Sequence, residues 1–159
     1  MAVAAAIGLL ASTQASAHSI RAVTAPANWT FSGAAQVVIP GMTTAPFVKL
    51  FGRNYIVNFS AECAVDAPAG NSSGWTDVDI VLLNLAGAVV TTLAPTAGAF
   101  DGFCAANGTA GFDGWEMNAI NAVVPAALPA GVYRAQVRAR LNGGATGGWF
   151  GERSLIVTY

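Results

Sequence analysis

Charged residues are scarce in this sequence of 159 residues. Asp, Glu, Lys and Arg together make up 9% of it, and the formal net charge is -1. An ordinary globular domain carries about 25% charged residues. The seven basic residues, of which one is a lysine, are too few for a phosphate-binding footprint, so no nucleic-acid partner is expected. A surface with so little charge also resists self-association poorly.

Histidine is almost absent, with His18 as its one instance. Because His is the commonest general acid or base in enzymes, a Ser-His-Asp or Cys-His catalytic site is not expected. The sequence therefore favours a protein that is not an enzyme.

A long apolar run is missing as well. No stretch of about 18 or more apolar residues is present, so no membrane span is expected. Residues 1–11 are apolar, and the small residues Ala15, Ser16 and Ala17 follow them, which predicts a secretory signal peptide over 1–17. No basic residue precedes the apolar part, and the alternative is an Ala-rich helix packed on the protein. If the signal peptide is cleaved after Ala17, we expect residues 18–159 to form a single domain of a secreted or periplasmic protein.

Cysteine occurs twice, at Cys63 and Cys104. Neither has a CxxC or metal-ligand spacing, and two cysteines in an oxidising compartment are usually bridged. We therefore expect a disulfide between them. Cys63 falls on the apolar side of a predicted strand, whereas Cys104 falls in a stretch with little regular pattern, so the bridge is expected to pin an irregular connection to the core.

Alternation of apolar and polar residues recurs along the chain, and helical periodicity does not. It is clearest over 132–141, where five apolar residues alternate with Arg134, Gln136, Arg138 and Arg140. Separated by Gly and Pro turns, the predicted strands are 19–24, 35–39, 47–50, 55–63, 76–85, 89–93, 115–124, 132–141 and 154–159. This pattern predicts an all-β fold, an antiparallel, jelly-roll-like sandwich of eight or nine strands. The segment 128–133 and the arginine-bearing strand after it resemble a late strand of secreted jelly-roll domains, including carbohydrate-binding modules.

Three tryptophans, Trp75, Trp115 and Trp149, each follow a glycine in or near a predicted loop. An indole ring in such a place can lie flat against a sugar, so these residues are candidate ligand contacts. The alternative is that the rings cap the ends of the core. An exposed cluster of all three would favour recognition.

Arg134 and Arg138 are candidate contacts for a carboxylate or phosphate ligand. The alternative is that the arginine row is paired with acids of an adjacent strand, with Glu116 and Glu152 as the candidates. Asp77 and Asp79 lie on one face of a strand and could bind Ca²⁺; no other cofactor is expected. The other interpretation is that they face the arginines across the sheet.

The first functional hypothesis is an exported, non-enzymatic sandwich with a binding or adhesion role. Its partner would be a glycan, a cell-surface component or a matrix component. The alternative is a self-assembling subunit resembling pilins or coat proteins, with Leu155, Val157 and Tyr159 forming an edge strand available for pairing. A third hypothesis is a metal-dependent or acid-based hydrolase, with Asp101, Asp113 and Glu116 as candidate carboxylates.

Overall fold

The computed structural model describes residues 19–97, 102–112 and 114–159. The predicted signal peptide and His18 lie outside these residues. Within the described part no helix is long and apolar enough to cross a membrane. The strands are β1 (Ser19–Ala25), β2 (Trp29–Ser32), β3 (Val37–Thr43), β4 (Phe47–Lys49), β5 (Tyr55–Asp66), β6 (Trp75–Leu83), β7 (Val89–Thr92), β8 (Gly102–Ala105), β9 (Glu116–Val124), β10 (Gly131–Asn142) and β11 (Gly147–Thr158).

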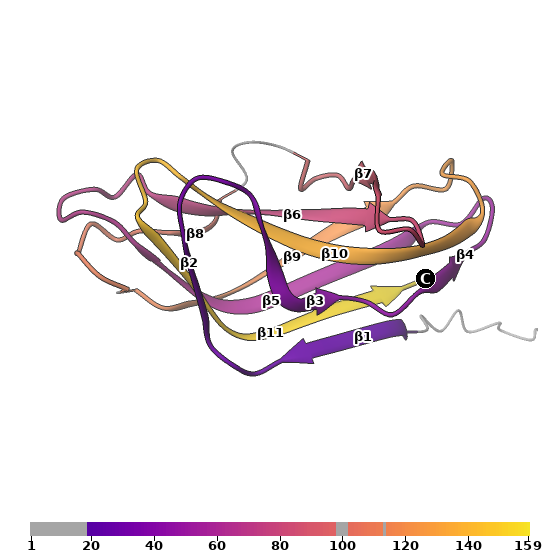
Figure 1. The fold of residues 1–159 in the computed structure, drawn as a ribbon, viewed down its shortest axis with the longest axis horizontal. Coiled ribbons are helices and arrows are strands. Elements are labelled where there is room, and N and C mark those ends of the chain that lie inside the picture. Colours follow the sequence, from indigo (N-terminus) through magenta and orange to yellow (C-terminus); the bar gives the residue numbers. More distant parts are fainter. Residues whose placement is uncertain (1–18, 98–101, 113) are drawn as a thin grey trace, which may run out of the picture.

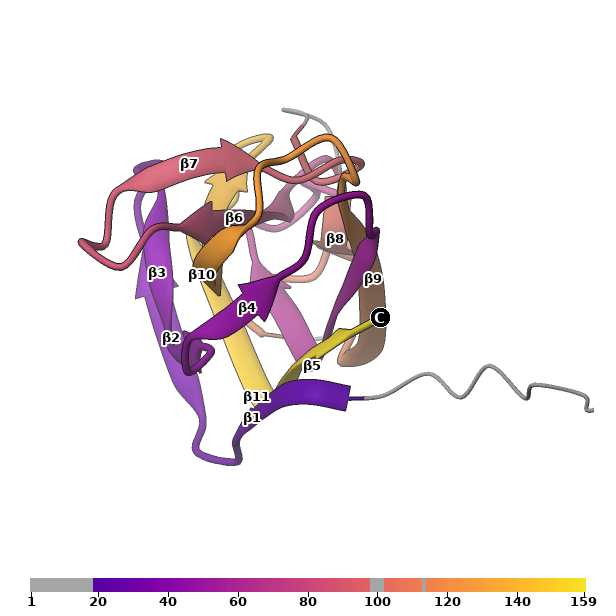
Figure 2. The ribbon, with the colours of Figure 1, turned by 90° about the vertical axis from the view of Figure 1, so that its right-hand side faces the viewer.

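These strands form two antiparallel sheets packed face to face (Figures 1 and 2). The first sheet has the order β1-β11-β5-β9, and β2 also pairs with β11. The second has the order β3-β10-β6-β7, with β4 on β10 and β8 on β6. The first strand thus pairs with the last, β3 with β10, and β5 with β9, as in a double-sheet jelly roll. The predicted all-β sandwich is confirmed.

The described residues contain eleven strands, more than the eight or nine predicted. The two short strands β2 and β8 were missed because four residues are too few to display alternation. The last strand also begins at Gly147 and not at 154. Its first residues, Gly147 and Gly148, follow Gly143 and Gly144 in the sequence and resemble a continuation of the turn.

Glycines in β11 make room for aromatic rings. A Cβ on Gly148 would overlap the ring of Phe31, which stacks on Phe150 with centroids 6.0 Å apart. A Cβ on Gly151 would overlap the ring of Trp149. The Gly-rich start of β11 is therefore a packing feature of a strand.

The core lies between the sheets and follows the predicted alternation. In β5, Tyr55, Val57, Phe59 and Cys63 are buried, and in β10 every second residue from Tyr133 is buried in the same way. This confirms that Cys63 points to the apolar side.

The prediction that the C-terminal strand is an edge strand is wrong. Strand β11 lies between β1 and β5 and pairs with both along residues 153–158. Leu155 and Val157 are fully buried, and only Tyr159 beyond them is exposed. The pairing with β1, an N-terminal segment far away in sequence, removes the free edge.

Lys49 is fully buried in β4. Its Nζ donates hydrogen bonds to three backbone carbonyls, those of Leu50 at 3.1 Å, Ala126 at 3.3 Å and Leu128 at 2.8 Å. An ammonium group has three N–H donors, so each has an acceptor. The lysine thereby ties the connection between β9 and β10 to β4.

Candidate functional site

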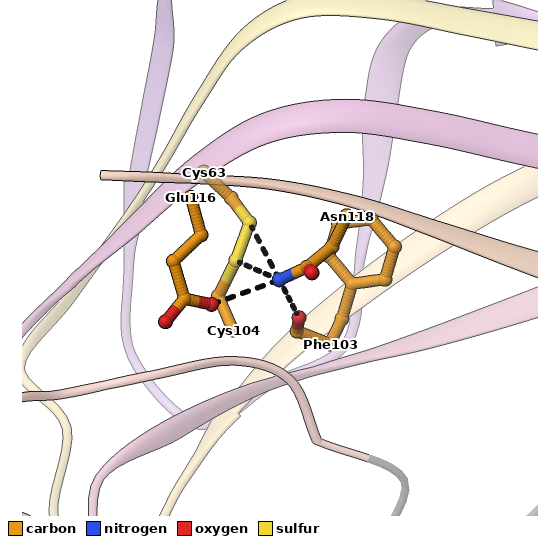
Figure 3. Close-up of a disulfide and its surroundings, with 5 residues drawn as sticks. All are labelled: Cys63, Phe103, Cys104, Glu116 and Asn118. Atoms are coloured by element: carbon orange, nitrogen blue, oxygen red, sulfur yellow. Dashed lines mark hydrogen bonds between the residues drawn. A yellow bond between two sulfur atoms is a disulfide. The ribbon is translucent and has the colours of Figure 1, made fainter. Parts of the chain in front are cut away.

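The disulfide between Cys63 and Cys104 is present, with a Cα–Cα distance of 6.3 Å (Figure 3). Cys104 lies in β8, which pairs with β6, whereas Cys63 lies in β5 of the other sheet. The bridge therefore joins two strands of opposite sheets. The prediction that it pins an irregular connection to the core is wrong, because Cys104 lies in a strand. Beside it, Nδ2 of Asn118 donates to the Phe103 carbonyl at 2.7 Å and to Oε2 of Glu116 at 2.9 Å, and lies 3.4 Å from the Cys104 sulfur.

At this end of the sandwich, two tryptophans stack on the outer face of the β11 sheet. The rings of Trp115 and Trp149 have centroids 4.6 Å apart. Trp149 is buried, whereas Trp115 is 66% exposed, and its Nε1 donates to the carbonyl of Phe112 at 2.9 Å. Phe112 and Met117 are also exposed. We call Phe112, Trp115, Met117 and Trp149 the aromatic end.

A second group of exposed apolar side chains lies at the opposite end of the strands, which faces the viewer in Figure 2. Phe51 is 79% exposed in the loop after β4, next to Leu50 at 55%. Val48 and Val132 form a cross-strand pair between β4 and β10, and both are exposed. We call Val48, Leu50, Phe51 and Val132 the Phe51 end.

Two of the three tryptophans predicted to contact a ligand, Trp115 and Trp149, lie together in the structure. Trp75 pairs with Ala105 and Asn142 in the other sheet and lies at the same end of the strands, but on the opposite outer face from Trp115 and Trp149. It packs against Gly102 and Gly143. Trp149 is covered by Trp115, so Trp115 is the one of the three that presents most of its ring to solvent.

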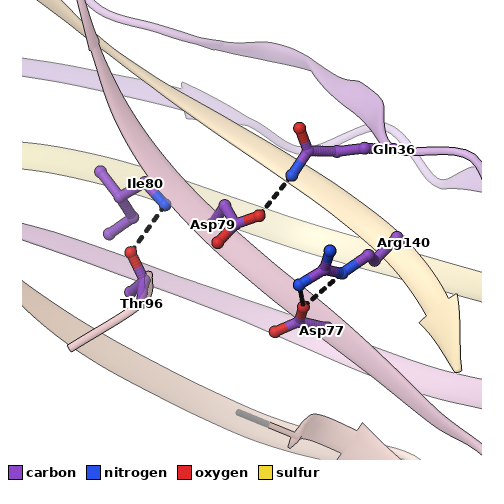
Figure 4. A network of polar contacts seen from close by, with 6 residues as sticks. All are labelled: Gln36, Asp77, Asp79, Ile80, Thr96 and Arg140. Carbon is purple, nitrogen blue, oxygen red and sulfur yellow. Dashed lines mark hydrogen bonds and ion pairs between the residues drawn. The ribbon is translucent and has the colours of Figure 1, made fainter. Parts of the chain in front are cut away.

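Two arginines of the β10 row, Arg138 and Arg140, lie opposite the acids of β6, as one interpretation of Asp77 and Asp79 predicts. Figure 4 shows Arg140 beside Asp77. Arg140 forms an ion pair with the buried Asp77, and its Nε donates to Oδ2 of Asp77 at 2.6 Å. Asp79 lies opposite Arg138 and accepts a hydrogen bond from Gln36. The other acids proposed as partners of the arginine row, Glu116 and Glu152, lie in β9 and β11 of the other sheet. The prediction that they pair with the row is therefore wrong.

The two arginines predicted to bind a ligand have neighbours within the same sheet. Arg138 donates from Nε to Oε1 of Gln136 at 3.0 Å. Arg134 lies opposite Leu83, near the far end of β6, and its Nε is buried. Anion binding by these residues stays a prediction.

Replacing Arg140 with Leu is expected to lower the free energy of unfolding by about 2 kcal/mol, because it leaves the Asp77 carboxylate buried without its ion-pair partner. The loss is smaller than for a fully buried pair because the Arg140 side chain is 28% exposed. Chemical denaturation measures the change. The double variant Arg140→Leu/Asp77→Leu should regain part of the loss, and equal losses in single and double variants would contradict this account.

A depression of about 330 Å³ lies by the end of β1 and the middle of β11. Its lining includes Ser60, Met117, Glu152 and Arg153. Arg153 is 4% exposed, and its Nη1 donates to the carbonyls of Phe150 at 2.9 Å and Gly151 at 2.8 Å. Burial lowers the pKa of the Arg153 guanidinium from its usual value. These bonds satisfy carbonyls at the bulge of β11, where two residues oppose Glu62 of β5.

The metal-binding and hydrolase hypotheses both depend on acidic side chains. Within the described ranges, no three His, Cys, Asp or Glu side chains gather where they could hold a metal ion. The Ca²⁺ prediction for Asp77 and Asp79 remains untested. Of the three candidate carboxylates, Asp101 and Asp113 lie outside the described residues, and Glu116 is exposed and bonded to Asn118.

Sequence reasoning missed the Phe51 end and two members of the aromatic end, Phe112 and Met117. A signal for the first was present, because Leu50 and Phe51 directly precede Gly52 in a turn, where polar residues are usual. Gln36, which bonds Asp79, carried no such signal, since a single glutamine near the start of the predicted strand 35–39 is unremarkable.

No protein-family model matches this sequence, and no characterised protein sequence is similar to it. Its fold does match solved structures of infectious bursal disease virus. A VP2 subviral particle is 15% identical with a TM-score of 0.55, over 98% of this chain and 37% of that chain. The Gx strain structure is 17% identical with a TM-score of 0.57, over 98% and 36% of the two chains. Derived T=1 particles give 15% identity and a TM-score of 0.58, over 98% and 36%. This chain thus spans little more than a third of those proteins, and the likeness shows the fold alone.

Proposed function

We propose that this chain is a non-enzymatic, self-assembling structural subunit, comparable to a coat or pilin subunit, whose copies associate through apolar ends. The observation that carries the proposal is the exposure of large apolar side chains at both ends of a weakly charged sandwich. Phe51 is 79% exposed at one end and Trp115 is 66% exposed at the other. Burying such side chains against another copy is favourable by about 25 cal/mol per Å² of apolar surface.

The fold is compatible with this role. Double-sheet jelly rolls occur in viral coats and also in lectins, so the fold by itself does not choose between assembly and recognition. The structures that match this chain include particles, which supports assembly. The Cys63–Cys104 bridge supports a location in an oxidising compartment, outside the cytoplasm.

The oligomeric state tests the proposal. The mass of the purified protein, measured by light scattering after size exclusion, should rise with concentration over about a hundredfold range. Electron microscopy of the heaviest fraction should show regular assemblies. The double variant Phe51→Ser/Trp115→Ser should stay monomeric under the same conditions because both ends lose their largest exposed apolar side chain.

The matched control is Val38→Ser. Val38 is an exposed apolar residue of β3 that belongs to neither end, with 44% of its surface accessible. The Val38→Ser variant should assemble like the original protein. A protein that is monomeric at the highest concentration would contradict the proposal, as would equal effects of the control and the double variant.

The exposed Trp115 ring keeps glycan recognition as a second candidate function. An aromatic face open to solvent can stack on a sugar ring, and Trp149 holds this one in place. A glycan array separates the two candidates. A monomeric protein that binds a glycan and loses it in Trp115→Ser would support recognition and exclude assembly as the main role.

A further inference from the structure

The two apolar ends differ in charge. Arg53 lies in the same exposed loop as Phe51, and Arg21 is exposed nearby, with its Nε bonded to the carbonyl of Pro46 just before β4. At the aromatic end the exposed and half-buried charges are acidic, and Arg153 beside Met117 is buried. Glu116 is exposed next to Trp115, and Glu62 is half-buried opposite Met117. The Phe51 end is therefore positive and the aromatic end negative among the described residues.

These opposite charges cannot neutralise each other within one copy. Glu116 lies opposite Cys63 in the β5–β9 pairing, whereas Arg53 precedes Tyr55 at the other end of β5. About ten residues of extended chain, or roughly 30 Å, separate them. This is several times the screening length of about 8 Å at physiological salt. Each end thus presents its charge to solvent or to a neighbour.

We propose that copies associate head to tail, with the Phe51 end of one copy on the aromatic end of the next, an inference that rests on the proposed function. A contact between two identical ends would place Arg53 near another Arg53, or Glu116 near another Glu116, and like charges at an interface are unfavourable. The head-to-tail contact instead places Arg53 near Glu116 and joins two apolar surfaces.

This arrangement has a structural consequence. A contact between two different surfaces leaves one of each free on every growing assembly, so association continues until the chain of copies closes into a ring, or it forms a filament. An isologous contact would stop at a dimer. Discrete dimers as the end state would therefore overturn the head-to-tail contact.

Charge reversal tests the contact. Arg53→Glu places an acid opposite Glu116 of the next copy, and Glu116→Arg places a base opposite Arg53 of the next copy. Each variant alone should therefore associate about tenfold more weakly than the original protein. An equimolar mixture of the two should regain association because each copy then meets a complementary end. Sedimentation velocity on the separate and mixed proteins measures this.

Two further measurements keep the test falsifiable. Val38→Glu introduces an acid at an exposed position of β3 that belongs to neither end and should associate normally. Because Glu116 also accepts a bond from Asn118, the unfolding midpoint of Glu116→Arg is measured first. If the fold is lost, Glu116→Gln replaces it without the mixing step and should weaken association on its own. If the original protein assembles but reversal and mixing change nothing, the head-to-tail contact is wrong and assembly stands. If the original protein does not assemble at all, the proposed function fails.

Discussion

Replacing both cysteines, as in Cys63→Ala/Cys104→Ala, is expected to lower the free energy of unfolding by about 4 kcal/mol. The bridge closes a loop with a sequence separation of 41 and joins β5 of one sheet to β8 of the other. Without it the unfolded chain gains conformational freedom. The short strand β8 is then held by its pairing with β6, by packing and by the bond from Asn118 to the Phe103 carbonyl. Urea unfolding followed by tryptophan fluorescence measures the loss.

A reducing agent provides the control for this prediction. It should destabilise the original protein to the level of the double variant and leave the double variant unchanged. A thiol titration of the unfolded, unreduced protein should find no reactive cysteine. Equal unfolding midpoints for the original protein and the double variant would show that the bridge contributes no stability.

Lys49→Met should lower the free energy of unfolding by about 3 kcal/mol. Methionine fills a similar volume but cannot donate, so the carbonyls of Leu50, Ala126 and Leu128 lose the partner that they share. The connection between β9 and β10 then loses its tie to β4. Denaturation at a concentration too low for assembly measures the effect.

Arg53→Gln is the matched control, because it removes a positive charge four residues away in an exposed loop and should change stability by less than about 0.5 kcal/mol. A second readout is chemical. An amine-reactive ester should leave Lys49 unmodified in the folded protein, where the side chain is fully buried, and modify it in urea. Rapid acylation of Lys49 in the folded protein would contradict the burial on which the prediction depends.

The sequence by itself determined the all-β class, nine of the strands, the inward face of β5 and β10, and the identity of the disulfide partners. Each of these follows from local alternation or from the presence of two cysteines, so it needs no knowledge of which strands are neighbours. The same holds for the scarcity of charge, which made self-association a hypothesis before any contact was known.

The tertiary structure alone decided which strands lie side by side. Pairing between β1 and β11 turned a predicted edge strand into an interior one, and pairing between β6 and β10 selected Asp77, and not Glu116 or Glu152, as the partner of Arg140. The stacking of Trp115 on Trp149, and the separation of Arg53 from Glu116 by the length of β5, are likewise long-range facts. Local periodicity shows which way a side chain points along its own strand. It carries no record of the strand across from it, which depends on how the whole chain buries its apolar faces.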